Sequence, residues 1–350
     1  MKPDFETTWK SPSNIALVKY WGKHGAQLPN NASLSLTLKN AHTITTLKAY
    51  RLHSGLQVKY LFEEEHRPDF EAKVKRYIET LRNEMPFIDE YALEIQSRNS
   101  FPHSAGIASS ASSMSALALC LVSLEYALQR NPTHTPAFFN RASFIARLGS
   151  GSASRSVFGQ WATWGKIDGL PQTSDIYASP LRVKNAPLFQ QMRDAVLLVS
   201  SSPKKVSSSM GHSLMNVHPF ASARYRQANE NLQALMFSMQ VGDFETFASI
   251  VENEALTLHS LLMTSSDDGL LLKPGSLQLL EEIRQFREQT GARVCFTLDA
   301  GPNIHLLYPE SEKEIVHGFI RDSLLGHCEN QQWIDDEMGI GPEQIEPKRK

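Results

Sequence analysis

The stretch that decides the fold is Phe101-Pro-His-Ser-Ala-Gly-Ile-Ala-Ser-Ser-Ala-Ser-Ser-Met-Ser-Ala-Leu117. Its first half is a run of small residues with Gly106 at a turn, and its second half opens an apolar segment, Ala111 to Leu128, long enough for several helical turns. The first N–H groups of a helix lack partners and carry partial positive charge, so small residues there let a phosphate approach the backbone. Ser109 and Ser110 add hydroxyl donors. On its own, the pattern fits close packing of this helix against a sheet equally well.

The composition predicts a soluble cytoplasmic protein of two domains. The chain has 350 residues, of which 41% are hydrophobic and 21% charged. No stretch approaches the roughly 20 unbroken apolar residues of a membrane-spanning helix, and Met1 to Lys10 lacks the apolar core of a signal peptide. The net charge of −2 gives no global field for nucleic acid or a membrane surface, so any anionic ligand must be held locally.

Cysteine and histidine patterns give no sign of a metal centre. Cys120, Cys295 and Cys328 are widely spaced and form no Cys-x-x-Cys pair, so we expect buried or incidental thiols rather than disulfides or a zinc site. The twelve histidines are scattered and include no His-Glu-x-x-His sequence.

The first part of the chain is predicted to form a mainly antiparallel sheet. Ser13 to Trp21 reads as a strand, followed by a turn at Gly22-Lys23. Lys19 is unusual within this apolar run, because a buried ammonium needs a partner; the alternative is a strand-end lysine that reaches solvent. The other elements expected here are strands at 34–38, 43–50, 56–62 and 91–96 and helices at 69–85, 111–128 and 136–149.

A second loop of small residues, Gly149 to Ser156, contains a single arginine. The Arg155 guanidinium offers paired donors that match a carboxylate or a phosphate, although a solvated surface arginine is the plainer interpretation of the loop alone.

The second part of the chain is expected to begin near Pro187, after a stretch rich in Pro, Asp and Ser. Asp299 lies in the turn Asp299-Ala-Gly-Pro-Asn303, where an acid can also serve simply as a turn former. The polar tail from Asp335 to Lys350 is expected to lie draped or frayed on the surface. The other expected elements are a strand at 195–200, a Ser- and Lys-rich loop at 200–211, helices at 219–239, 243–263 and 276–288, and strands at 294–298 and 304–308.

In this order, the segments resemble the diphosphomevalonate decarboxylases of the GHMP kinase superfamily over nearly the whole chain. The Lys19-Tyr-Trp-Gly-Lys23 and Ser150-Gly-Ser-Ala-Ser-Arg-Ser156 pieces are particular to this branch. The full set of markers is Asn14-Ile-Ala-Leu-Val-Lys-Tyr-Trp-Gly-Lys23, Leu28-Pro-Asn-Asn-Ala-Ser-Leu-Ser35, Phe101 to Ala111, Ser150 to Ser156, Lys204-Lys-Val-Ser-Ser208, Asn253-Glu-Ala-Leu256 and Asp299 to Asn303.

The resemblance implies ATP-dependent decarboxylation of mevalonate 5-diphosphate to isopentenyl diphosphate, with release of ADP, phosphate and carbon dioxide. A tertiary hydroxyl is a poor leaving group, so ATP phosphorylates it before the phosphate and carboxylate leave. Asp299 matches the catalytic aspartate that orients or deprotonates the 3-hydroxyl. Lys19 would stabilise the charge of Asp299 and steady the transferred phosphate, and Arg155 would grip the substrate carboxylate.

The resemblance also implies two binding regions. Magnesium should bridge the ATP phosphates, with Ser110 as a further ligand. The substrate would be bound by Tyr20, Lys23, Ser150, Ser152, Arg155 and Ser208. ATP would be bound by Asn99, Ser104, Ala105, Gly106, Ser109 and Ser110.

The implied fold is the two-domain α/β GHMP kinase architecture. An N-terminal domain like ribosomal protein S5 domain 2 is expected over residues 1–187, and a C-terminal ferredoxin-like domain over 188–350. The site would lie between them. Members of the family are commonly homodimers, so a homodimer is expected that binds small molecules, with neither nucleic acid nor membrane as a partner.

Four departures from the family pattern are visible: Ile107, Ser154, the pair His103-Ser104, and His212 after Gly211. The two histidine departures can shift affinity or the shape of the substrate site, but none of the four removes a catalytic group. Three alternatives stay open: a decarboxylase acting on mevalonate 5-phosphate, a mevalonate-type kinase that stops after phosphoryl transfer, and a non-catalytic phosphometabolite-binding protein.

Overall fold

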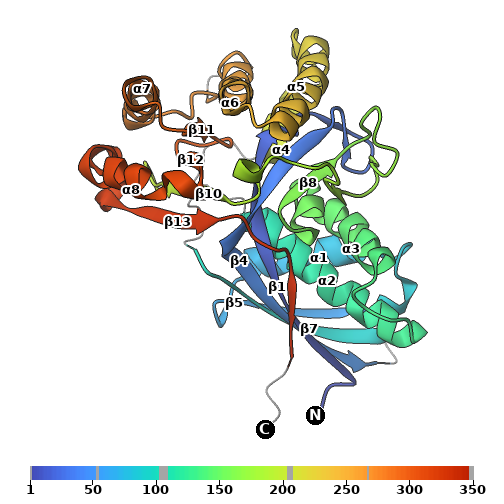
Figure 1. Cartoon of the computed structure of the whole chain (residues 1–350). Helices are drawn as coiled ribbons and strands as arrows, with labels where there is room; N and C mark the ends of the chain where they lie inside the picture. The colour runs from blue at the N-terminus through green and yellow to red at the C-terminus, as the bar shows by residue number, and fades with distance from the viewer. Residues whose placement is uncertain (1, 53–54, 102–108, 203–207, 266–267, 347–350) are drawn as a thin grey trace.

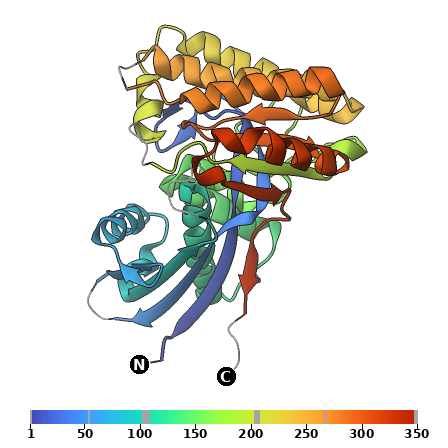
Figure 2. The ribbon, with the colours of Figure 1, turned by 90° about the vertical axis from the view of Figure 1, so that its left-hand side faces the viewer.

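The chain folds around two β-sheets, each covered by helices (Figures 1 and 2). The computed structural model describes residues 2–52, 55–101, 109–202, 208–265 and 268–346. The first sheet lies at the end of the molecule that carries both termini, and the helices at 221–290 lie at the opposite end.

The first sheet has eight strands in the order β14-β1-β4-β7-β5-β6, with β8 pairing β4 and β9. The pairs are antiparallel, except that β5 and β7 run parallel. The apolar helix α2 packs against β1 and β4, and α3 packs against α2. The strands are β1 (Phe5–Val18), β4 (Ser33–Arg51), β5 (Gln57–Phe62), β6 (Glu65–His66), β7 (Tyr91–Asn99), β8 (Trp161–Trp164), β9 (Ser179–Pro180) and β14 (Glu343–Ile345), and the helices are α1 (Pro68–Thr80), α2 (Ser109–Gln129), α3 (Pro136–Gly149) and the 3₁₀ helix η2 (Gly151–Val157).

The second sheet is antiparallel throughout, in the order β11-β12-β10-β13. Helices α6 and α7 contact β11, and α8 contacts β12. The strands are β10 (Met192–Leu197), β11 (Cys295–Thr297), β12 (Ile304–Pro309) and β13 (Trp333–Glu337), and the helices are α4 (Ser208–Leu214), α5 (Ala221–Val241), α6 (Phe244–Met263), α7 (Pro274–Thr290) and α8 (Lys313–Asp322). A two-stranded ribbon, β2 (Lys23–His24) with β3 (Leu28–Pro29), follows β1.

Two long strands carry the first sheet into the second half of the molecule. At about 3.3 Å per residue, β1 spans roughly 46 Å and β4 roughly 63 Å. Residues 5–10 of β1 and 41–50 of β4 alternate between buried and more exposed side chains. Residues 11–18 of β1 and 33–38 of β4, in contrast, are buried on both faces of the sheet. Ile15, Leu34 and Leu36 pack there in one apolar cluster with Leu232 of α5 and Phe247 of α6. β1 therefore ends inside the protein, between its two halves.

The structure joins the two strands predicted at 34–38 and 43–50 into the single strand β4. Lys39 and Asn40 interrupt the apolar pattern because they are exposed, which explains the wrong prediction. The buried Asp336 carboxylate bridges the interruption, accepting the N–H groups of Lys39, Asn40 and Ala41 at 2.9, 2.7 and 2.7 Å. An acid about 300 residues away thus supplies the acceptors that these N–H groups need.

The prediction of a draped or frayed tail is wrong for residues 335–338 and 343–345, and residues 347–350 lie outside the described residues. Asp335 to Glu337 belong to β13, which pairs with β10, and β14 pairs with β1 through Thr8, Trp9 and Lys10. The polar sequence is misleading because both strands lie at sheet edges, where outward side chains stay in water. Smaller differences are helix α4, which begins within the predicted loop 200–211, and α1, which ends at Thr80 rather than residue 85.

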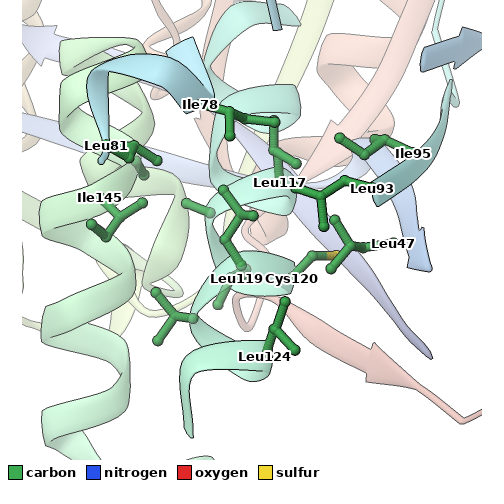
Figure 3. Packing of buried hydrophobic residues seen from close by; sticks show 14 of the residues in the cluster. Leu47, Ile78, Leu81, Leu93, Ile95, Leu117, Leu119, Cys120, Leu124 and Ile145 are labelled. Carbon is green, nitrogen blue, oxygen red and sulfur yellow. The ribbon is translucent and has the colours of Figure 1, made fainter. Parts of the chain in front are cut away.

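Helix α2 is the centre of the core under the first sheet (Figure 3). Leu117, Leu119 and Cys120 are at most 2% exposed and pack with residues of β4, β7, α1 and α3, including Leu47 and Ile145. By length and composition α2 could cross a membrane, but 72% of its most apolar window is buried inside the protein, and this position accounts for its apolar sequence. All three cysteines are free and buried, which confirms the prediction of incidental thiols.

Replacing a central leucine of α2 tests this packing. Leu119→Ala should lower the free energy of unfolding by about 3 kcal/mol in urea denaturation, because Leu119 is fully buried and its removal leaves a cavity. Leu128→Ala is the matched control on the same helix, since Leu128 is 47% exposed, and it should cost less than about 1 kcal/mol. Equal losses from the two variants would contradict the central role given to α2.

Candidate active site

Lys19 is the first residue after β1, and its ammonium is buried. Pairing of β1 with β4 is irregular between Ala16 and Val18, where the chain leaves the ladder. The Lys19 Nζ donates to the Ala16 carbonyl at 2.5 Å and lies 3.3 Å from Asp299 Oδ1. The alternative of a solvent-reaching strand-end lysine is therefore wrong.

Asp299 reaches this point from the second sheet, on the loop between β11 and β12. His259 Nε2 donates to the Asp299 carbonyl at 3.0 Å, and Asn303 holds the same loop by bonds of 2.9 and 3.1 Å to the backbone of Ser200. The Asp299 side chain is 28% exposed, so its carboxylate pairs with Lys19 while staying open to a ligand.

Arg155 lies in η2 and is buried, so it is not the surface arginine that its loop alone suggested. It is held by neutral groups: its Nη1 donates to Ser33 Oγ at 2.6 Å, and its Nε donates to Ser35 Oγ and Asn14 Oδ1 at 3.2 and 3.4 Å. Within the described part of the chain, no carboxylate lies within ion-pair distance of this guanidinium. A buried cation whose hydrogen bonds go only to neutral acceptors keeps a positive charge that an anionic ligand can pair with.

Tyr20 and His212 line the same region. The centre of the Tyr20 ring lies 4.6 Å from that of Trp164 and 4.3 Å from that of His212. The ring centres of His212 and Trp21 are 4.9 Å apart. The Tyr20 hydroxyl is buried and has no hydrogen-bond partner among the described residues. His212 Nδ1 accepts the Gly22 N–H at 3.0 Å, which leaves the ring proton on Nε2.

Small hydroxyl side chains meet where α2 begins. The Ser150 Oγ lies 3.5 Å from Ser110 Oγ and 3.3 Å from Ser152 Oγ, so the first turn of α2 and the Arg155 loop adjoin. Asn99, at the end of β7, connects to the same turn because its Oδ1 accepts from Thr43 Oγ1 at 2.8 Å. The Thr43 hydroxyl in turn lies 2.7 Å from Ser112 Oγ on α2.

For the other predicted site residues the structure gives fewer contacts or none. Lys23 lies in β2, and its Nζ donates to Gln27 Oε1 at 2.9 Å. Ser208 is the first residue of α4, and Ser109 is the first of α2. Ser104, Ala105 and Gly106 of the proposed phosphate loop, together with the departures His103 and Ile107, lie outside the described residues.

Burial shapes the charge of the site. It lowers the pKa of Lys19, and Asp299 opposes that effect by its negative charge. Burial lowers the pKa of Arg155 to about 10, so the guanidinium stays charged near neutral pH. Burial, reinforced by the charges of Lys23 and Arg155, lowers the pKa of His212 to about 3, so the imidazole is neutral. The positive charges of Lys19 and Arg155 both act on Asp299, and the nearby acid Glu254 is already paired with Arg224. Cations therefore outnumber acids here, an excess suited to a polyanionic ligand.

Two features bear on the ligands that the site fits. The unpartnered Tyr20 hydroxyl and the Arg155 guanidinium suit an acidic, phosphorylated molecule. Within the described ranges there is no group of three or more His, Cys, Asp or Glu side chains that could hold a metal ion. A magnesium ion here would consequently take most of its ligands from phosphate oxygens.

Sequence reasoning missed the residues that hold Lys19 and Arg155 in place. Asn14, Ser33 and Ser35 lie within motifs that carry the family resemblance, but no pattern in the sequence marks them as partners of Arg155. Glu254 also lay within a quoted motif, but Arg224, which binds it, has no local signal because the two are 30 residues apart.

Two family models cover most of the chain. The model described as diphosphomevalonate decarboxylase-like N-terminal domain matches residues 11–177, and that described as mevalonate 5-diphosphate decarboxylase C-terminal domain matches residues 195–347.

Relatives and solved structures agree with these models. A diphosphomevalonate decarboxylase of Aspergillus fumigatus is 31% identical over 342 residues, covering 92% of this chain and 81% of the relative. The crystal structure of mevalonate diphosphate decarboxylase from Staphylococcus aureus is 30% identical, with a TM-score of 0.82 over 97% of this chain and 98% of that one. A structure described as MDDEF in complex with MVAPP, AMPPCP and magnesium is 28% identical, with a TM-score of 0.81 over 98% and 99% of the two chains.

These matches confirm the mixed α/β fold in two domains that the resemblance implied. The two family models match consecutive parts of the chain, and the similarity to whole relatives covers both parts. The chain therefore belongs to the diphosphomevalonate decarboxylase family.

Proposed function

We propose that this protein catalyses the ATP-dependent decarboxylation of mevalonate 5-diphosphate to isopentenyl diphosphate, releasing ADP, phosphate and carbon dioxide. The observation that carries the proposal is the pairing of Lys19 with Asp299 beside a buried Arg155 that has only neutral partners. An acid, an ammonium and a guanidinium are the groups that phosphorylation of a hydroxyl followed by loss of a carboxylate requires.

Phosphorylation falls to Asp299 and Lys19. The Asp299 carboxylate accepts the proton of the tertiary 3-hydroxyl and orients its oxygen toward the γ-phosphorus of ATP. The Lys19 ammonium, 3.3 Å from that carboxylate, balances the negative charge that gathers on the transferred group. Because Lys19 is buried, this charge interaction is screened less than it would be in water.

Elimination depends on Arg155. Its paired N–H donors match the substrate carboxylate and orient the C–CO₂ bond for cleavage as the new phosphate leaves. Asn14, Ser33 and Ser35 fix the guanidinium without neutralising it, so its charge is available to that carboxylate.

The remaining groups are assigned to binding. Tyr20, Lys23, Ser150, Ser152 and Ser208 hold the substrate, whose diphosphate supplies charge for the excess of cations. ATP is assigned to Asn99, Ser109 and Ser110 together with Ser104 to Gly106. Ser110 would also contribute a ligand to a bound magnesium ion. The metal, when bound, neutralises phosphate charge.

The organisation of the protein is proposed in the same way. The domains divide near residue 187, between the ranges matched by the two family models, and the final strand β14 returns to the first sheet. Resemblance to the family supports a cytoplasmic homodimer.

A comparison of substrates tests the proposed function. Purified protein with ATP and magnesium should release ADP and carbon dioxide in equal amounts from mevalonate 5-diphosphate, and neither product from mevalonate or its 5-phosphate. Release of both products from the monophosphate would instead assign the protein to that substrate. ADP without carbon dioxide would mean a kinase, and tight binding without turnover would mean a non-catalytic binding protein.

Removal of the acid tests the role of Asp299. Asp299→Ala should slow ADP release by about 10³-fold or more, because general base and orientation are both lost, while the dissociation constant of ATP changes little. Asp322→Ala, at an exposed acid at the end of α8, is the control. Turnover near that of the unmodified protein would remove Asp299 from the mechanism.

Exchange of the guanidinium for an ammonium tests Arg155. Arg155→Lys should slow carbon dioxide release by about 100-fold, because a point charge cannot form the paired hydrogen bonds to a carboxylate. Arg193→Lys is the matched control, since Arg193 is also buried but pairs with Glu310, Asp335 and Glu337 away from the site. Similar rates for both variants would argue against carboxylate binding by Arg155.

A further inference from the structure

The backbone of Lys19 is held by side chains from outside the sheet. Its N–H donates to Glu254 Oε2 at 2.8 Å, and its carbonyl accepts from Asn31 Nδ2 at 2.9 Å and from Arg224 Nη2 at 3.3 Å. Because β1 ends at Val18, no ladder bond is available to fix this peptide. Two helices of the second half, α5 and α6, therefore set the position of a residue that belongs to the first.

Arg224 and Glu254 form a fully buried ion pair. The side chains are 1% and 0% exposed, and Arg224 makes bonds of 2.7 and 2.6 Å to the two carboxylate oxygens. Asn231 Nδ2 donates to Glu254 Oε1 at 2.7 Å, so the carboxylate has partners on both oxygens. Replacing such a pair by apolar side chains of similar size is often neutral or stabilising, so stability alone does not account for it.

We infer that Arg224 and Glu254 are positioning residues that fix Lys19 opposite Asp299. The inference rests on the proposed function, in which Lys19 balances the charge of the reacting groups. It gives a role to the motif Asn253-Glu-Ala-Leu256, whose acid accepts the backbone N–H of Lys19. A small displacement of this peptide would move Nζ away from Asp299, and catalysis is sensitive to such changes.

Four charged groups face Lys19 from the elements packed around it: Asp299 from the β11–β12 loop, Glu254 from α6, Arg224 from α5 and Arg155 from η2. The charges of Asp299 and Glu254 raise the pKa of Lys19, whereas that of Arg155 lowers it. Loss of the Glu254 charge should consequently lower this pKa further, since the positive charge of Arg224 is then unopposed.

The experiment compares two neighbouring acids on α6. Glu254→Gln should reduce kcat by about tenfold or more, with the KM for ATP changed less than about twofold. Glu252→Gln is the matched control, because Glu252 is equally buried and pairs with Arg284 and Arg287, away from Lys19. Its kcat should stay within about twofold of that of the unmodified protein at a temperature where both are folded.

A second measurement does not depend on turnover. The pKa of Lys19 can be followed by NMR in protein carrying ¹³Cε-labelled lysine, with the signal assigned by Lys19→Arg. Glu254→Gln should lower this pKa by about 1 or more, and Glu252→Gln should leave it unchanged. Equal values in the two variants would overturn the inference. They would do so even if the protein proved to have a different substrate, whereas an expected shift without decarboxylation would count against the proposed function alone.

A double variant separates positioning from stability. Arg224→Met with Glu254→Leu removes both charges, so its melting temperature should recover relative to Glu254→Gln. Its kcat should stay low, because a leucine at position 254 offers the Lys19 N–H no acceptor. Recovery of kcat together with the melting temperature would show that the pair acts only through stability, and would overturn the inference.

Discussion

A buried ammonium needs negative charge beside it, and the site is built around meeting this need for Lys19. Strand β1 carries the residue into the interior, and Asp299 arrives from the second sheet to lie 3.3 Å from it. The two groups come from parts of the chain 280 residues apart. The pairing of Lys19 with Asp299 therefore exists only when both halves of the molecule are packed together on β1 and β4.

Arg155, unlike Lys19, is a buried cation whose hydrogen-bond partners are neutral. An amide and two hydroxyl groups accept its hydrogen bonds, and among the described residues Asp299 acts on its charge only from beyond ion-pair distance. A carboxylate at the position of Ser33 or Ser35 would stabilise the guanidinium and at the same time cancel its attraction for a ligand. The neutral acceptors thus hold in place a positive charge that they do not cancel, although burial lowers the pKa of Arg155 to about 10.

Local patterns predicted the parts of the protein that depend on near neighbours. Short stretches of sequence predicted the helix after the Gly/Ser loop, the Arg155 loop and the Asp299 turn. The family resemblance, based on the order of these segments, implied their roles. The continuity of β4 could not be read in this way, because the carboxylate that bridges its interruption is Asp336. The support of Lys19 by Arg224 was equally hidden, since a buried arginine on an amphipathic helix looks like a surface one. The roles of all the site residues, those of Ser104 to Gly106 and Ser208 included, stay predictions.

The pairing of β14 with β1 has a consequence for the order of synthesis. Residues 343–345 lie beside residues 8–10, so the first sheet has an open edge until almost all of the chain has been made. During translation, the edge of β1 that later pairs with β14 would expose unpaired N–H and C=O groups. Exposed strand edges of this kind promote association between nascent chains. Contacts of this sequence separation also slow folding, because a long loop must close before they form. The last strand of the chain thus completes the first sheet only after the second sheet that precedes it has been synthesised.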